Sequence, residues 1–302
     1  MRKFALACAL FLSYTLFAQD DLLKELEAEQ AKDKALTEFT TATFKATRII
    51  NGYSIEMPAK KNLQFIIQHR FGSINSGWRE LFGIDNVDMR IGLEYGILPW
   101  LSAGFGRSSV GGTYDLSARI KMLRQSKGGR NIPFSMAWYS NIAINSKEQP
   151  PEVDKVHRVS YAHQLMIARK FTRNFSFQVS PTYVHMNLVP TSNDKNDVFA
   201  VGMGARYLVT RSISINAEYF QPVTKREDGE LYIGSLSVGI DIETGGHVFQ
   251  VIITNSTGMI EQFYIPNNAA YWWDKEIHLG FNINRNIPLG GGGKKKKKSP
   301  SE

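Results

Sequence analysis

Apolar and polar residues alternate with a period of two along most of the chain after residue 62. In VDMRIGLEYGIL (87–98), every second residue from Val87 to Ile97 is apolar, and the residues between them are charged or glycine. This period is typical of a β-strand whose two faces meet different surroundings. In a soluble sheet the apolar face packs on a core, whereas in an outer-membrane barrel it faces lipid and the charges face the lumen.

The same alternation recurs often enough to predict a chain that is nearly all β. Most of the predicted strands have about ten residues or more, which fits a strand that crosses a bilayer at a tilt. We expect twelve strands, at 63–71, 87–98, 101–109, 113–125, 134–145, 156–171, 175–188, 197–210, 213–223, 231–243, 247–256 and 277–287.

Short and long connections alternate between these strands. Tight turns are predicted at 99–100, 172–174, 211–212 and 245–246, and long polar connections at 72–86, 146–155, 189–196, 224–230 and 257–276. Outer-membrane barrels place short turns on the periplasmic side and long loops outside, whereas a soluble β-sandwich, the alternative, has no reason to sort them. We therefore predict an all-β, antiparallel, up-and-down transmembrane β-barrel of about twelve strands, with both termini in the periplasm.

The chain begins MRKFALACALFLSYTLFAQ, where two bases, an apolar stretch and a small-residue site form the layout of a secretory signal peptide. Residues 20–39 are rich in Ala, Leu, Glu and Lys, which favour helix. The arm that contains them either plugs the lumen or hangs free in the periplasm. We assign 1–18 to a signal peptide, 19–58 to an N-terminal periplasmic helical arm and linker, 59–289 to the barrel and 290–302 to a disordered Gly/Lys-rich tail.

The net charge of +8 is concentrated at the ends of the chain. Removing seven bases (Arg2, Lys3 and 294–298) and one acid (Glu302) from 36 and 28 leaves 29 basic and 27 acidic residues. A body so close to neutral gives no electrostatic case for nucleic acid. The lysines 294–298 either bind anionic head groups of the inner leaflet or stay solvated.

No cofactor or metal is predicted. The only cysteine, Cys8, lies in the predicted signal peptide, which leaves no disulfide or cysteine-based metal site. The six histidines are scattered and form no HExxH motif.

Charges of both signs occupy the face that a barrel would turn inward. A charge can face the lumen only if water or a partner compensates it, so mixed signs predict ion pairs that fill or narrow the tube. A lining of one sign would instead indicate an ion-selective pore. The predicted lumen-lining residues are Asp88, Arg90, Glu94, Asp115, Arg119, Lys121, Arg158, Arg206, Glu218 and Asp241.

Two histidines on the outward face raise the alternative of a membrane hydrolase. If the turn at 172–174 sets the register, His163 faces Tyr183 and His185 faces Tyr161. We expect no serine beside them on that face, so an interfacial belt of aromatic and imidazole rings explains them better than catalysis does.

The connection 257–276 is the longest and carries several aromatic residues. Exposed aromatics in a long loop indicate a binding surface or a lid, and the alternative is that they fold inward over the barrel mouth. The aromatic residues concerned are Phe263, Tyr264, Tyr271, Trp272 and Trp273.

Several motifs resemble a domain-of-unknown-function family of outer-membrane β-barrel proteins from Gram-negative bacteria. The resemblance extends from Phe44 to Ile287 and implies a barrel and an outer-membrane address. It implies no activity, substrate or catalytic residue. The motifs are FKATRIING (44–52), IIQHRFGSINSG (66–77), LFGIDNVDMRIGLEYGI (81–97), FGRSS (105–109), TNSTGMIEQFYIPN (254–267) and GFNINR (280–285).

These observations lead to a non-enzymatic, porin-like expectation: a narrow or gated passage for a small solute in the outer membrane, surrounded by membrane lipids. The first alternative is a closed barrel that anchors or binds a periplasmic or surface protein. The second is a lipid hydrolase at His163 and His185.

Overall fold

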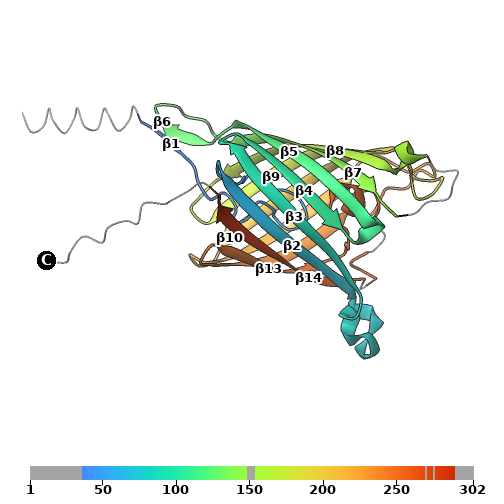
Figure 1. Cartoon of the computed structure of the whole chain (residues 1–302). Coiled ribbons are helices and arrows are strands. Elements are labelled where there is room, and N and C mark those ends of the chain that lie inside the picture. The colour runs from blue at the N-terminus through green and yellow to red at the C-terminus, as the bar shows by residue number, and fades with distance from the viewer. Residues whose placement is uncertain (1–35, 148–153, 269–270, 275, 290–302) are drawn as a thin grey trace, which may run out of the picture. The chain divides into compact units, whose positions relative to one another are not determined.

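The computed structural model describes residues 36–147, 154–268, 271–274 and 276–289. Twelve antiparallel strands form one closed barrel (Figure 1). Each matches a predicted strand to within a few residues. They are β2 (Asn62–Ser73), β3 (Val87–Leu98), β4 (Leu101–Ser108), β5 (Thr113–Leu123), β7 (Ser135–Asn145), β8 (Val159–Lys170), β9 (Phe175–Met186), β10 (Asp197–Leu208), β11 (Ile213–Pro222), β12 (Ser235–Thr244), β13 (His247–Thr254) and β14 (His278–Pro288).

Each barrel strand pairs with its neighbours in sequence, and the last strand pairs with the first. β14 closes on β2 through pairs such as Asn282 with Gln68 and Asn284 with Ile66. The predicted up-and-down topology is therefore confirmed. Closure leaves no strand edge with unpaired backbone groups, which is the condition for strands to stand in lipid.

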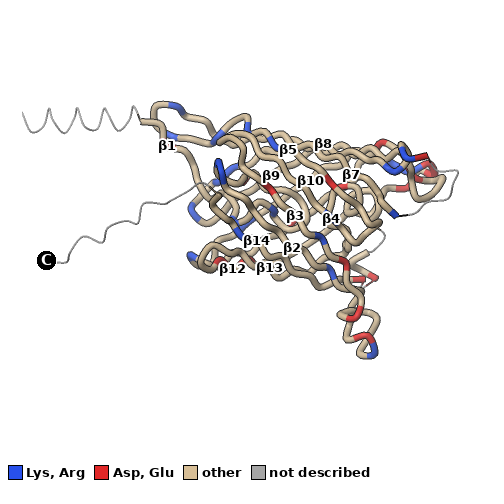
Figure 2. Tube along the Cα trace, viewed as in Figure 1, with Lys and Arg blue, Asp and Glu red and all other residues tan. Residues whose placement is uncertain are grey.

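The outer face is apolar and the inner face is polar. Ile91, Leu116 and Val251 point outward and are 39%, 57% and 57% exposed. Arg90 and Asn282, on the inner face, are 2% and 0% exposed. A soluble sandwich would bury the first group and expose the second, so the alternation places the charges inside. Figure 2 shows charged residues mainly at the ends of the barrel and in its loops.

Residues 42–58, which we call the plug, run inside the barrel (Figure 1). Its chain reverses between Thr47 and Ser54, where Ile49 N–H donates to Gly52 O at 2.9 Å and Ser54 N–H to Thr47 O at 2.9 Å. Phe44, Ile49, Ile50, Tyr53 and Ile55 of the plug cluster with wall residues that include Met166 and Ile252. The lumen of the barrel is therefore filled by its own chain.

Shorter elements complete the fold. β1 (Thr37–Phe39) pairs with β6 (Ser126–Gly128) in a two-stranded sheet that belongs to a separate compact unit. The helix predicted for 20–39 lies outside the described residues up to residue 35, and it is wrong for Thr37–Phe39, which form a strand. The short helices are η1 (Ile74–Ser76), η2 (Trp78–Gly83), η3 (Val110–Gly112), η4 (Lys155–Arg158) and α2 (Glu261–Tyr264). Among the residues that the structure describes, no helix is long and apolar enough to cross a membrane.

Candidate functional site

The candidate site is the filled lumen, and its wall is crossed by two ion pairs. Arg90 on β3 donates two hydrogen bonds from its guanidinium to Asp115 on β5, at 3.0 Å from Nε to Oδ1 and 2.6 Å from Nη2 to Oδ2. Arg119 on β5 donates from both Nε and Nη2 to a single oxygen of Glu94 on β3, with Nε to Oε1 at 2.8 Å. All four side chains are nearly fully buried. The bidentate pair of Arg90 with Asp115 fixes geometry as well as adding energy.

A glycine on the intervening strand makes room for the first of these pairs. β4 lies between β3 and β5, and its inward positions include Gly104 and Gly106. A Cβ on Gly106 would lie 2.2 Å from Arg90 Nη2 and 2.5 Å from Asp115 Oδ1. Only glycine at residue 106 therefore lets Arg90 reach Asp115 across β4. Both ion pairs therefore join strands two apart along the inner face of the wall.

Glu218 on β11 holds the tip of the plug. Its carboxylate accepts backbone N–H groups from Ile50 at 3.2 Å, Asn51 at 2.9 Å and Gly52 at 3.0 Å. A Cβ on Gly52 would lie 2.7 Å from Cζ of Phe220, so only glycine allows this approach. Three N–H donors converging on one carboxylate make an anion-binding turn.

Other wall side chains bind the carbonyl groups of the plug. Gln178 Nε2 donates to Tyr53 O at 2.8 Å, and Gln250 Nε2 donates to Ile49 O at 2.9 Å. Asn282 Nδ2 donates to Ile50 O at 3.0 Å. Arg119 Nη1 donates to Glu56 O at 2.7 Å. These donors satisfy backbone groups that would otherwise be buried without partners in an irregular segment.

The loop between β13 and β14 closes the lumen from the end with the long connections. Its residues 255–268, which we call the inner loop, turn into the barrel, and Met259, Ile260 and Tyr264 are fully buried. Glu261 accepts from the Tyr139 hydroxyl at 2.9 Å and from the Tyr264 hydroxyl at 3.2 Å. Burial, with Glu261 beside it, raises the pKa of Tyr264 well above its ordinary value, so this hydroxyl stays protonated as a donor.

Arg48 joins the plug to the inner loop. Its guanidinium lies over the ring of Tyr53, 4.0 Å from the ring centre, and Nη1 donates to Met259 O at 3.2 Å. Nη1 also donates to Asn51 O within the plug. The two closing segments therefore meet inside the barrel.

Some of the aromatic residues in the connection 257–276 fold into the barrel, and others are exposed. Tyr264 is buried inside, and Phe263 is half-buried beside it. Tyr271 and Trp273 are 45% and 85% exposed, and Trp272 Nε1 donates to Leu236 O of β12 at 3.0 Å.

Most of the predicted lumen-lining side chains are buried on the inner face of the wall. Arg206 and Asp241 are buried there, Lys121 is half-buried, and Asp88 lies at the rim, where its carboxylate accepts from Ser109 at 3.0 Å. Arg158 lies at the end of the barrel with the long connections, where it lines a pocket with Thr113 and Gln262. It lies in η4, because β8 begins at Val159, later than the alternation predicted.

The outward histidines have a serine neighbour that the prediction missed. The pairs of His163 with Tyr183 and of Tyr161 with His185 are confirmed. Ser140 of β7 faces His163 from the other side, with Oγ 2.9 Å from Nδ1, and Trp138 Nε1 donates to Ser140 Oγ at 2.9 Å. The expectation that no serine lies beside these histidines is therefore wrong. Ser140 lies two residues after Trp138 on β7 and therefore points outward as Trp138 does. This spacing could have placed Ser140 on the outer face from the sequence alone.

No metal centre emerges from the part of the chain that the structure describes. Within those ranges, no three His, Cys, Asp or Glu side chains gather closely enough to hold a metal ion.

Fold and lumen together define a membrane-bound β-barrel that is closed by its own chain. Residues 44–287 match the family described as "Membrane bound beta barrel domain (DUF5777)", so the chain belongs to that family. No curated protein matches the chain.

Solved barrels resemble it at low identity. A KdgM porin is 10% identical, with a TM-score of 0.45 over 74% of this chain and 97% of that chain. A NanC porin is 8% identical, with a TM-score of 0.46 over 74% and 97%. Outer membrane phospholipase A from Escherichia coli is 12% identical, with a TM-score of 0.42 over 77% and 92%. These likenesses do not assign a function.

Proposed function

We propose that the protein is a gated passage for a small solute in the outer membrane, closed by the plug and the inner loop. The observation that carries this proposal is the mixed chemistry of the wall that the plug covers. Apolar contacts of Ile50 and Tyr53 with the wall stabilise the closed state. Most of the other side chains on the inner face are polar, so water can solvate them when the plug leaves.

Several polar atoms of the wall have no hydrogen-bond partner among the described residues. They include Gln64 Oε1, Gln68 Nε2, Arg70 Nε and Asn284 Oδ1. A buried polar atom without a partner costs roughly 1–3 kcal/mol. A wall built only for permanent closure would be apolar or fully paired, whereas these atoms gain water in an open state. This pattern supports gating over a permanent seal.

The orientation of the barrel in the outer membrane is part of the same proposal. Long connections outside and short turns in the periplasm would place the plug's entrance on the periplasmic side, next to the arm that follows the predicted signal peptide. A periplasmic protein that binds this arm would then be able to draw the plug out.

Conductance in a planar bilayer tests the proposal. We would compare the chain that begins at Gln19 with a chain that begins at Ala59 and lacks the plug, after showing by heat-dependent gel mobility that both are folded barrels. We expect rare openings in the first and sustained conductance in the second. Silence from the folded second chain would reject the passage and favour the closed anchor.

A second candidate function is lipid hydrolysis, which the contact between Ser140 and His163 favours. Ser140 Oγ would attack an ester carbonyl while Nδ1 of His163 accepts its proton and returns it to the departing alcohol oxygen, and water would then release the fatty acid from Ser140. The pair lacks, among the described residues, a carboxylate or carboxamide bound to the other ring nitrogen. Fatty-acid release from phospholipid vesicles would support this candidate only if Ser140→Ala abolishes it while His185→Ala does not.

A further inference from the structure

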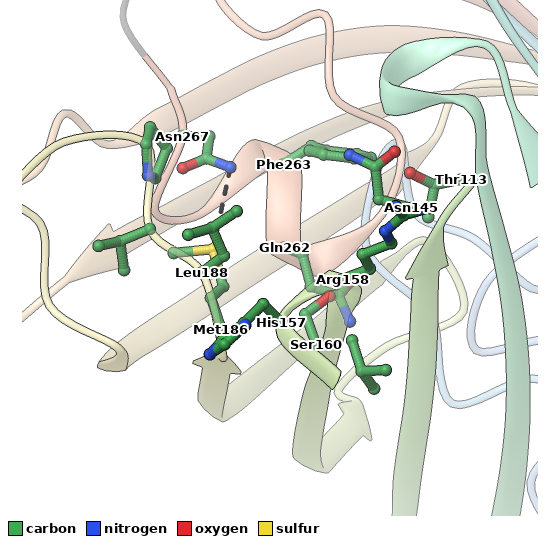
Figure 3. A pocket seen from close by; sticks show the side chains of 13 residues that line it. Thr113, Asn145, His157, Arg158, Ser160, Met186, Leu188, Gln262, Phe263 and Asn267 are labelled. Atoms are coloured by element: carbon green, nitrogen blue, oxygen red, sulfur yellow. Dashed lines mark hydrogen bonds between the residues drawn. The ribbon is translucent and has the colours of Figure 1, made fainter. Parts of the chain in front are cut away.

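A pocket opens at the end of the barrel that carries the long connections. It lies among the ends of β5, β7, β8 and β9, the helix η4 and the inner loop (Figure 3). Its volume is about 230 Å³. Pockets for drug-sized ligands run from roughly 300 to 1,000 Å³, so this one suits a smaller molecule.

Two buried polar atoms in the pocket lack partners. Thr113 and Gln262 are each 2% exposed, and neither Thr113 Oγ1 nor Gln262 Oε1 has a hydrogen-bond partner among the described residues. The amide nitrogen of Gln262 does have a partner, because Nε2 donates to Asn141 Oδ1 at 2.8 Å. Buried polar atoms are nearly always paired in proteins, so these two indicate a polar ligand.

The charge of the pocket is positive. Arg158 and His157 line it, and none of the described residues that line it is acidic. None of the ion pairs among the described residues includes Arg158, and its Nε has no hydrogen-bond partner there. The planar fork of an arginine matches a carboxylate through two parallel hydrogen bonds.

The remaining surface of the pocket is apolar. Figure 3 shows Met186 and Leu188 on one side of Gln262, with Thr113 and Asn145 on the other. Phe263 and Pro190 also contribute to the lining. A ligand that bound Arg158 through an anionic group would therefore place a hydrocarbon part against these side chains.

We infer that this pocket binds a small organic carboxylate with an aromatic ring or a branched chain. The inference rests on the proposed function only in taking this carboxylate as the solute that the passage serves. Because Gln262 and Phe263 belong to the inner loop, the bound ligand would contact one of the two segments that close the lumen.

Calorimetric titration of the refolded chain in detergent tests the inference. Benzoate and isovalerate are the probes, and benzamide is the neutral match for benzoate. We expect saturable binding of a carboxylate, with benzamide at least about tenfold weaker than benzoate because it cannot supply the charge. Binding requires no passage of ions, so this result is independent of conductance.

Variants locate the site. Arg158→Gln should weaken carboxylate binding at least about tenfold, and Thr113→Val should weaken it by a smaller factor. Arg173→Gln, in the exposed turn at the opposite end, is the control and should bind as the unaltered chain does. The inference is overturned if neither carboxylate binds, if benzamide binds as well as benzoate, or if Arg158→Gln leaves binding unchanged.

Discussion

Replacing Glu218 by alanine removes the acceptor for three N–H groups at the tip of the plug. Glu218 is 2% exposed, and the donors are Ile50, Asn51 and Gly52. Leaving a buried donor without a partner costs roughly 1–3 kcal/mol. Because neighbouring losses do not add fully, we expect the closed state to be destabilised by about 3–6 kcal/mol.

This magnitude predicts a large change in gating. At 1.4 kcal/mol for each factor of ten, the population with the plug released rises by roughly 10² to 10⁴. Single-channel recording should show the open fraction of Glu218→Ala increasing accordingly. Glu218→Gln keeps one acceptor oxygen and should show a smaller increase.

A matched control separates this effect from a general loss of charge. Glu227→Gln removes an exposed carboxylate from the connection between β11 and β12, where Lys195 lies 3.5 Å away. Its open fraction should equal that of the unaltered chain. If Glu218→Ala folds as a barrel and opens no more often than Glu227→Gln, the reasoning about the plug is wrong.

Two further predictions concern the plug and the wall. Gly52→Ala should also raise the open fraction, because its Cβ would meet Phe220 at 2.7 Å; an unchanged open fraction would show that the tip docks differently. Arg90→Met should lower resistance to thermal unfolding, followed by gel mobility, because it leaves Asp115 buried without its partner, a change that costs about 3–5 kcal/mol. Arg90→Met with Asp115→Leu should recover most of that loss, and failure to recover would mean that the pair does more than neutralise charge.

The barrel itself could be predicted because its signals are local. Alternation depends only on which face each residue presents, and it located all twelve strands. The register of β8 with β9 could also be predicted, since a tight turn sets the pairing of the strands that it joins. His163 accordingly faces Tyr183.

The filling of the lumen could not be predicted, because its contacts join distant parts of the chain. Asn51 contacts Glu218 and Ser237, which lie more than 160 residues away. The sequence of residues 44–58 suggests a strand-like linker and does not show where it lies, so it left both a free arm and a plug open. The start of β8 was predicted three residues too early, because the alternation continues through η4 and nothing in the pattern marks Val159 as the first strand residue.

The central claim is that the plug must leave for the passage to open, and the reactivity of a cysteine at residue 54 tests it most directly. Ser54 is 0% exposed in the plug, and its hydroxyl donates to Ala46 O at 2.6 Å. A chain that begins at Gln19 contains no other cysteine, so Ser54→Cys gives a single site. During bilayer recording, a bulky water-soluble thiol reagent should react only while the channel conducts and should then hold it open. Conducting steps with residue 54 still unmodified would contradict the account.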